Sequence, residues 1–202
     1  MTSPPKIDAR IRLLAKDLGV LRPRDLIARG IPREYAQRLS DRGELIRIGR
    51  GLYTLPDSTG SSHRSLAEVS KAVPLGVICL LSALRLHGLT TQNPPEVWIA
   101  LPNNAWRPSA PPFRVHVNHL SGSAWTEGVE VHTIDGVPVR IYSPAKTVAD
   151  CFKFRNKIGI DVAVEALRDY LRMHRSGADD LWRFARLNRV GRVIQPYLES
   201  VL

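Results

Sequence analysis

The sequence predicts an α+β fold, with an N-terminal winged helix-turn-helix followed by a mixed or antiparallel sheet and a helical C-terminal part. Three observations predict it. Residues 31–56 have the pattern of a helix, a short hinge and a tight basic hairpin. Residues 96–142 hold short β-branched and aromatic runs bounded by Pro and Gly, and residues 143–201 hold apolar residues at helical spacing.

Two helices are predicted before the hairpin. Apolar side chains recur at helical spacing from Ile7 to Leu18, and the pattern stops at Gly19. A shorter helix is predicted to start at Arg22-Pro23 and to end by Gly30, because proline suits a first helical turn. Helix, short helix, tight turn, helix and hairpin is the order that a winged helix-turn-helix requires.

The third helix and the hairpin form the predicted DNA-reading stretch. Pro32 and Gly43 suit the two ends of a helix, and short strands are expected over Glu44–Ile48 and Leu52–Leu55. Between the strands lies the turn Gly49–Gly51, GRG, whose glycines permit the reversal and hold an arginine at the tip. We interpret this tip as a wing that follows the DNA backbone while the helix occupies the major groove.

The charge of the chain favours a polyanionic partner or an acidic protein surface. Its formal net charge is +10, with a pI near 10.2 and 44% hydrophobic residues. Residues 1–64 hold 13 Lys and Arg against 7 Asp and Glu, residues 65–150 hold 6 of each kind, and residues 151–202 hold 10 against 6. Two basic ends therefore flank a neutral middle, although a basic enzyme would share this composition.

Six residues are the candidates for DNA contact. Ala36 and Leu39 of the third helix are expected to pack inward, which leaves Arg33, Gln37, Ser40 and Asp41 pointing outward. Arg and Gln on this helix are side chains that can read base edges, whereas arginines at a hairpin tip favour phosphate or the minor groove. The alternative is an ordinary solvated helix face, and Tyr53 is expected to pack in the core. The candidates are Arg24, Arg33, Gln37, Arg38, Arg47 and Arg50.

A polar Ser/Gly segment, DSTGSS at residues 57–62, is the predicted linker. The expected domains are therefore residues 1–57 and residues 63–202. In the second domain a helix is expected over His63–Ala72, while residues 77–87 read as a strand or as a helix that stops at glycine. Strands are expected at Glu96–Leu101, Phe113–Val117, Val129–Ile134 and Val137–Tyr142, the last two joined by the hairpin signal Asp135-Gly136.

The C-terminal part is predicted to be helical. Ser143-Pro144 is a good N-cap with proline at the first helical position. Further helices are expected over Asp161–Met173, Ala178–Leu187 and Val190–Val201. Arginines recur three or four residues apart on two of them, and these stripes are compatible with a solvated face, an extended DNA footprint or an acidic protein partner: Arg168, Arg172, Arg175, Arg183, Arg186 and Arg189.

Three segments, taken in their order, resemble the AbiEi family of bacterial antitoxins: DRGELIRIGRGLYTLP, then LLSALRLHGL followed by VWIALP, and IYSPAKTVADCF. The resemblance implies an N-terminal winged helix that binds operator repeats and represses its own operon. It also implies a C-terminal antitoxin domain that counteracts a nucleotidyltransferase-like toxin, as in type IV systems, where a stable complex is not required. By position, Arg47, Arg50, Gly51 and Tyr53 fall in the wing motif, and Ser82, His87, Gly88, Ser143, Thr147 and Asp150 fall in the antitoxin-domain motifs.

The antitoxin-domain residues allow two interpretations. His87 can be a helix C-cap, and Thr147 and Asp150 can hold their helix against the sheet through buried hydrogen bonds. Alternatively, Lys146, Thr147 and Asp150 could form a polar or phosphate site with Ser82 or His87. A toxin-modifying enzyme that uses Ser82, Lys146 and Asp150 is therefore the second functional hypothesis, ahead of a DNA endonuclease.

No catalytic residue, cofactor or metal is predicted. His116, His119 and His132 lack the spacing of a zinc site, and GRG is not a phosphate-binding loop. The two cysteines, the absence of a signal-like N-terminus and the lack of a run of about 18 apolar residues favour a cytoplasmic protein with no membrane partner. Two-fold operators imply two copies on DNA, which is compatible with a monomeric free chain.

Overall fold

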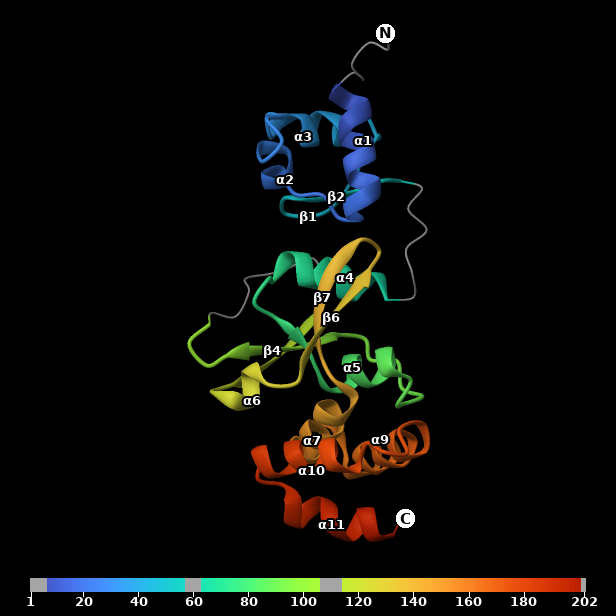
Figure 1. The fold of residues 1–202 in the computed structure, drawn as a ribbon. Helices are drawn as coiled ribbons and strands as arrows, with labels where there is room; N and C mark the ends of the chain where they lie inside the picture. Colours follow the sequence, from blue (N-terminus) through green and yellow to red (C-terminus); the bar gives the residue numbers. More distant parts are fainter. Residues whose placement is uncertain (1–6, 57–62, 106–113, 201–202) are drawn as a thin grey trace. The chain divides into compact units, whose positions relative to one another are not determined.

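A computed structural model of the chain describes residues 7–56, 63–105 and 114–200. Its helices and strands confirm the α+β class (Figure 1). Contacts divide the chain into two compact units, one formed by residues 1–74, 108–113 and 133–139 and the other by residues 75–107, 114–132 and 140–202. The expected linker 57–62 lies outside the described residues, so the boundary near residue 60 stays a prediction.

The N-terminal elements follow the winged helix-turn-helix order. They are α1 (Ile7–Leu18), α2 (Pro23–Ile27), α3 (Glu34–Asp41), β1 (Ile46–Gly49) and β2 (Leu52–Thr54). Their own core contains buried apolar side chains from each helix and from β2, among them Ile11, Leu26, Leu39 and Tyr53. Tyr53 also exchanges backbone hydrogen bonds of 2.8 and 2.9 Å with Leu21, so the segment between α1 and α2 joins the hairpin.

Several boundaries differ from the sequence prediction, and β1 and β2 end at Gly49 and Thr54 rather than at Ile48 and Leu55. α3 begins at Glu34 rather than at Pro32, and Arg33 occupies the N-cap position. β1 begins at Ile46 rather than at Glu44, because the backbone N–H groups of Glu44 and Leu45 both donate to the carbonyl of Leu39. These two N–H groups satisfy a carbonyl group at the C-terminus of α3, so pairing with β2 begins only at Ile46.

A five-stranded mixed sheet forms the middle of the protein, as expected. Its strands are β3 (Val77–Ile78), β4 (Val97–Pro102), β5 (Val115–Leu120), β6 (Val129–Ile134) and β7 (Val137–Tyr142), in the order β5-β4-β3-β7-β6. β3 pairs antiparallel with β4 and parallel with β7, and β4 pairs parallel with β5. The expected strand Phe113–Val117 starts later and runs to Leu120, with His116 opposite Trp98.

The ambiguous residues 77–87 contain both elements. β3 has only two residues, and α5 (Leu80–His87) follows almost at once. The change occurs at Cys79, whose backbone N–H donates to Trp98 in the sheet while its carbonyl accepts from Ala83 in the helix. Gly88 ends α5 in the left-handed conformation at φ +69°, which confirms the predicted helix end at this glycine.

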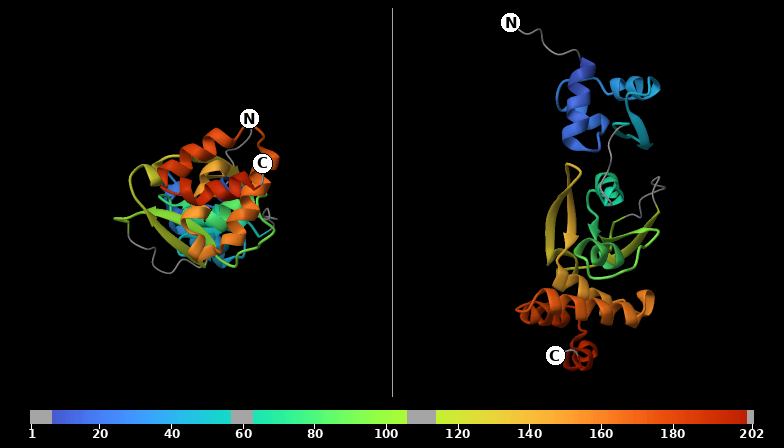
Figure 2. Two further views of the ribbon diagram at one scale, coloured as in Figure 1. Left: turned by 90° about the horizontal axis from the view of Figure 1, so that it is seen from below. Right: turned by 90° about the vertical axis from the view of Figure 1, so that its right-hand side faces the viewer.

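The remaining helices begin with α4 (Arg64–Ala72) and continue in the C-terminal part as α7 (Pro144–Lys153), α9 (Ile160–Met173), α10 (Ala178–Leu187) and α11 (Gly191–Glu199). Two four-residue helices, α6 (Ser123–Thr126) and α8 (Arg155–Ile158), were not predicted, since four residues are too short to show a period. Helix α7 is central, because it packs against α5, α9 and α10 and every residue from 145 to 152 is buried. Figure 2 shows α11 beyond the layer of α9 and α10.

Candidate DNA interface and antitoxin-domain motif

The third helix presents one apolar and one polar face. Ala36 and Leu39 are fully buried in the N-terminal core, which confirms the predicted inward face. Gln37 and Arg38 are exposed, and Arg33, next to the helix start, is exposed as well. Ser40 is half-buried, although we expected it to point outward with Asp41.

The arginines of this helix make only weak contacts of their own. Arg33 lies 3.6 Å from the carboxylate of Glu34, and both side chains are more than half exposed. The guanidinium of Arg38 lies 5.3 Å from the ring centroid of Tyr35, which is cation–π range. Exposed contacts of these kinds contribute about 1 kcal/mol or less, so both guanidinium groups remain available to another anion.

Gln37 is held more firmly than the arginines. Its Nε2 donates to Asp41 Oδ1 at 2.7 Å, and its Oε1 accepts from the hydroxyl of Tyr53 at 3.1 Å. Tyr53 is 5% exposed and packs in the N-terminal core, which confirms that it is not a surface contact residue. The structure therefore links the predicted reading helix to the hairpin through one hydroxyl group.

The hairpin brings Arg47 next to this link. Arg47 pairs with Tyr53 across β1 and β2, and directly opposed residues of an antiparallel pair lie on the same side of the ribbon. Its Nε donates to the carbonyl of Gly49 at 3.2 Å, so the side chain bends toward the turn. Arg50 at the tip is exposed and has no hydrogen bond or ion pair within the described residues, and Gly51 has φ +66°.

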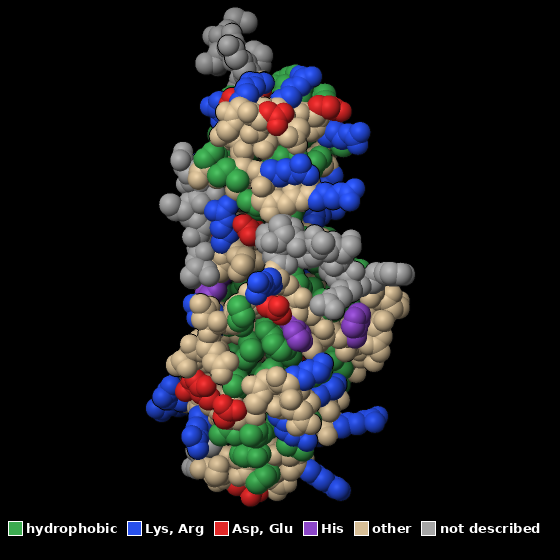
Figure 3. All heavy atoms as spheres, turned by 180° about the vertical axis from the view of Figure 1, so that it is seen from behind, with side chains coloured by type: hydrophobic (Ala, Val, Ile, Leu, Met, Phe, Trp, Pro, Cys, Tyr) green, Lys and Arg blue, Asp and Glu red, His purple; other side chains and the backbone are tan. Residues whose placement is uncertain are grey.

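All six DNA-contact candidates are exposed, Arg24 on α2 included. Five of them are cationic and one is an amide, and acidic side chains are close to them in sequence: Asp25 follows Arg24 on α2, and Glu34 and Asp41 lie on α3. Figure 3 shows Lys and Arg side chains at the surface of both the N-terminal elements and the C-terminal helices. The structure therefore leaves all six side chains accessible to an outside partner.

Three antitoxin-motif residues meet where β7 ends and α7 begins. The carbonyl oxygen of Tyr142 accepts from His87 Nε2 at 2.8 Å and from Thr147 Oγ1 at 3.1 Å. Ser143 caps α7 as predicted, because its Oγ accepts from the backbone N–H of Lys146 at 3.4 Å. Burial lowers the pKa of His87, so its neutral form, protonated on the nitrogen that faces the carbonyl, is favoured over the charged C-cap we had considered.

Asp150 belongs to a second, fully buried polar cluster. Its Oδ1 accepts from Lys146 Nζ at 2.5 Å and from Asn188 Nδ2 at 2.6 Å, and its Oδ2 has no partner in the described structure. Lys146 and Asp150 are 0% and 1% exposed, and burial raises the pKa of the Asp150 carboxyl. The Lys146 ammonium also lies 4.4 Å from the ring centroid of Tyr142.

Sequence reasoning missed part of this cluster. The four-residue spacing of Lys146 and Asp150 on a helix was a visible signal for their pairing. Asn188 had no such signal, because it lies 38 residues away from Asp150 and only the packing of α10 against α7 brings it near.

Ser82 stands apart from both groups. Its Oγ accepts from the backbone N–H of Trp98 at 2.9 Å and so ties α5 to β4. The side chain is buried, at 4% exposure. The five motif residues thus form three separate sets of internal hydrogen bonds, which favours a structural role over one shared polar site.

The histidines of the sheet do not converge. His116 stacks on Trp98 with ring centroids 3.8 Å apart, His119 bonds the carbonyl of Pro102, and His132 lies 3.1 Å from Glu130. Within the described residues, no group of three or more His, Cys, Asp or Glu side chains could hold a metal ion. No helix of the described part is long and apolar enough to cross a membrane.

The comparison with protein families decides the identity of the N-terminal part. Residues 9–56, from α1 to the end of the hairpin, match the family model of transcriptional regulators that are AbiEi antitoxins. This segment is similar to the regulator domain of AbiEi antitoxins. The match confirms the resemblance drawn from the wing motif, and it supports a regulatory role for the segment. A comparison with curated proteins gave no match.

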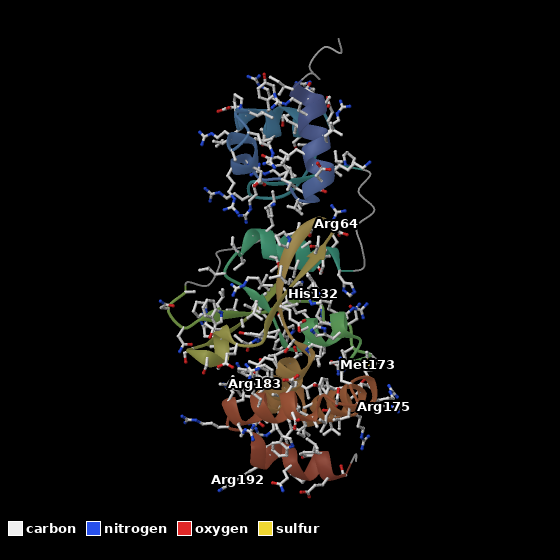
Figure 4. All side chains as sticks on the ribbon, in the orientation of Figure 1. Arg64, His132, Met173, Arg175, Arg183 and Arg192 are labelled. Carbon is white, nitrogen blue, oxygen red and sulfur yellow. The ribbon has the colours of Figure 1, made fainter. Side chains whose placement is uncertain are left out.

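The C-terminal arginines do not form one basic surface. Figure 4 shows Arg175 and Arg183 on opposite sides of the C-terminal helices. Arg168 lines a hollow of about 400 Å³ on α9 together with Asp161, Glu165 and Asp169. Arg172 pairs with Asp169 at 2.7 Å, and Arg183 pairs with Glu127 at 2.8 Å. Acidic neighbours therefore offset both predicted stripes in part.

Proposed function

We propose that this protein represses its own operon by binding operator DNA through α3 and the Gly49–Gly51 wing. The observation that carries the proposal is the set of six exposed candidates on an AbiEi-type domain, with Gln37 bonded to the hydroxyl of Tyr53 and Arg47 paired with Tyr53 across the hairpin. A helix in the major groove and an arginine at the hairpin tip would let one domain contact base edges and phosphates together. Two copies would occupy a two-fold operator.

The antitoxic action is assigned to the second predicted domain, residues 63–202, with a nucleotidyltransferase-like toxin as its target. Its motif residues Ser82, His87, Ser143, Thr147 and Asp150 are proposed to stabilise this domain rather than to contact the toxin. Their side chains are buried or half-buried and bonded to the protein's own backbone and side chains. Contact with the toxin, where it occurs, would then use exposed side chains of the C-terminal helices.

An enzyme that modifies the toxin is the second candidate, and the geometry disfavours the residues we considered for it. Ser82 accepts a hydrogen bond inside the fold, and Lys146 and Asp150 are at most 1% exposed, so none of the three can reach a substrate as they stand. Incubation of the chain with its toxin, ATP and magnesium, followed by intact mass measurement of the toxin, separates the candidates. A mass gain on the toxin would favour the enzyme.

The wing is tested by Arg50→Ala in the full chain, with Arg192→Ala as the control. Both residues are exposed arginines, and Arg192 lies on α11, outside the proposed DNA surface. The logarithm of the affinity for the chain's promoter DNA is measured against the logarithm of the salt concentration. Removal of one phosphate contact should lower the slope by about 0.9 per bound copy and weaken binding to every duplex sequence.

The control distinguishes loss of an arginine at the wing from loss of one positive charge anywhere on the surface. Arg192→Ala removes the same charge and should leave the salt slope almost unchanged. An unchanged slope and affinity in Arg50→Ala, or an equal loss in both variants, would contradict the assignment of the wing.

A further inference from the structure

The side-chain amide of Gln37 has a defined orientation before any DNA is bound. The carboxylate of Asp41 can only accept hydrogen bonds, so the amide nitrogen must face it, at 2.7 Å. The oxygen of the amide then faces Tyr53, whose hydroxyl donates to it at 3.1 Å. Both contacts agree on the same orientation, so the amide is assigned without ambiguity.

Tyr53 can hold this orientation because it is itself fixed. Its ring is 5% exposed in the N-terminal core, and its backbone N–H and C=O are both bonded to Leu21. Asp41 lies one turn after Gln37 on the same helix, so its distance from the amide is set by helix geometry. A side chain held in this way loses less conformational entropy when it binds.

The two contacts leave a particular bonding capacity on the exposed amide. A glutamine amide has two N–H donors and two oxygen lone pairs, and Asp41 and Tyr53 each use one. One donor and one acceptor remain on the amide. In the major groove only adenine offers the matching pair on one base, an acceptor at N7 and a donor at N6, whereas guanine offers two acceptors at N7 and O6.

We propose that Gln37 reads one adenine of the operator in the major groove, and that Tyr53 and Asp41 are the positioning residues that set its amide for this base. The inference rests on the proposed function, because it needs α3 to enter the major groove. Gln37 is the residue that touches DNA. Tyr53 acts through Gln37 from within the core, so it affects the choice of base without contacting a base.

The test begins with selection of duplexes from a randomised library by the full-length chain. The selected duplex is then remade with 7-deazaadenine at each adenine in turn, which removes the N7 acceptor and keeps the rest of the base pair. At one adenine the wild-type chain should lose about tenfold in affinity, and at the same base pair adenine should be preferred to guanine by a similar factor. Gln37→Ala should abolish both effects and leave the salt slope unchanged, because it removes no phosphate contact.

Tyr53→Phe tests the positioning role, with Tyr197→Phe as its control. The phenylalanine ring keeps the core packing and removes only the hydroxyl that donates to Gln37. The preference for adenine should fall several-fold in Tyr53→Phe, while overall affinity for unselected duplex and the salt slope stay the same. Tyr197 lies on α11, so loss of its hydroxyl should change neither quantity.

The outcomes separate this inference from the function on which it rests. If the wild-type chain selects no duplex, the proposed DNA binding fails, and the inference fails with it. If the chain binds a selected duplex but Gln37→Ala keeps its sensitivity to 7-deazaadenine, only the inference is overturned. If Tyr53→Phe keeps the full preference for adenine, Tyr53 is not a positioning residue. The midpoint of urea unfolding of each variant checks that it is folded.

Discussion

Replacement of Asp150 by alanine tests whether the buried motif is structural. The change removes the only acceptor that the described structure gives to Lys146 Nζ, and Asn188 Nδ2 loses its partner as well. A charge left unpaired in a protein interior costs about 3–5 kcal/mol. A whole domain is stable by only about 5–15 kcal/mol, so this single change should remove a large share of the free energy of unfolding.

The assay is urea unfolding followed by circular dichroism, with the double variant Lys146→Met/Asp150→Leu as the control. The double variant removes both charges and fills their space with apolar atoms, which is often neutral or stabilising for a buried pair. It should therefore be more stable than Asp150→Ala and than Lys146→Met alone, since each of these single variants leaves one buried charge unpaired. A loss below about 1 kcal/mol in Asp150→Ala, or a double variant less stable than both single variants, would refute the reasoning.

Two further predictions concern the second predicted domain, residues 63–202. Burial lowers the pKa of His87 below its value of about 6.5 in the unfolded chain, so its contribution to stability is present above about pH 6.5 and is lost as the pH falls through the lower folded pKa. Unfolding midpoints should fall from about pH 7.5 to about pH 5 in the wild type and fall less in His87→Gln, and equal pH profiles would contradict this role. Gly88→Ala should cost about 1 kcal/mol, because φ is +69° while a Cβ would meet nothing within 4 Å. The midpoint of Gly88→Asn should lie closer to that of the wild type, and an alanine variant as stable as the wild type would remove the assignment of Gly88 as a left-handed cap.

Local patterns were enough to predict most elements of the fold. α1, β6, β7 and α10 have the predicted bounds, because their ends carry signals such as Gly19 and Asp135-Gly136 and their apolar period is unbroken. The predictions were less accurate where a tertiary contact sets the boundary. β1 starts two residues later than predicted because the N–H groups of Glu44 and Leu45 bond to the C-terminus of α3. β3 has only two residues because a helix starts at Leu80.

The candidate sites were predictable in part for the same reason. Exposure of Arg33 and Gln37 followed from the apolar face formed by Ala36 and Leu39. The hydrogen bond from Tyr53 to Gln37 joins residues that are 16 positions apart, and no periodic pattern in the sequence predicts it. The carbonyl of Tyr142 accepts hydrogen bonds from both His87 and Thr147, and the bond from His87 likewise depends on how α5 packs against α7.

The central proposal is that α3 and the wing bind operator DNA. The most direct test is footprinting of the full-length chain on the DNA upstream of its own coding sequence, in parallel with an unrelated duplex of equal length. The account predicts protection of repeated sites on the upstream DNA, which Arg50→Ala weakens and Gln37→Ala redirects to other sequences. Equal protection of both duplexes, or protection that neither substitution alters, would contradict it.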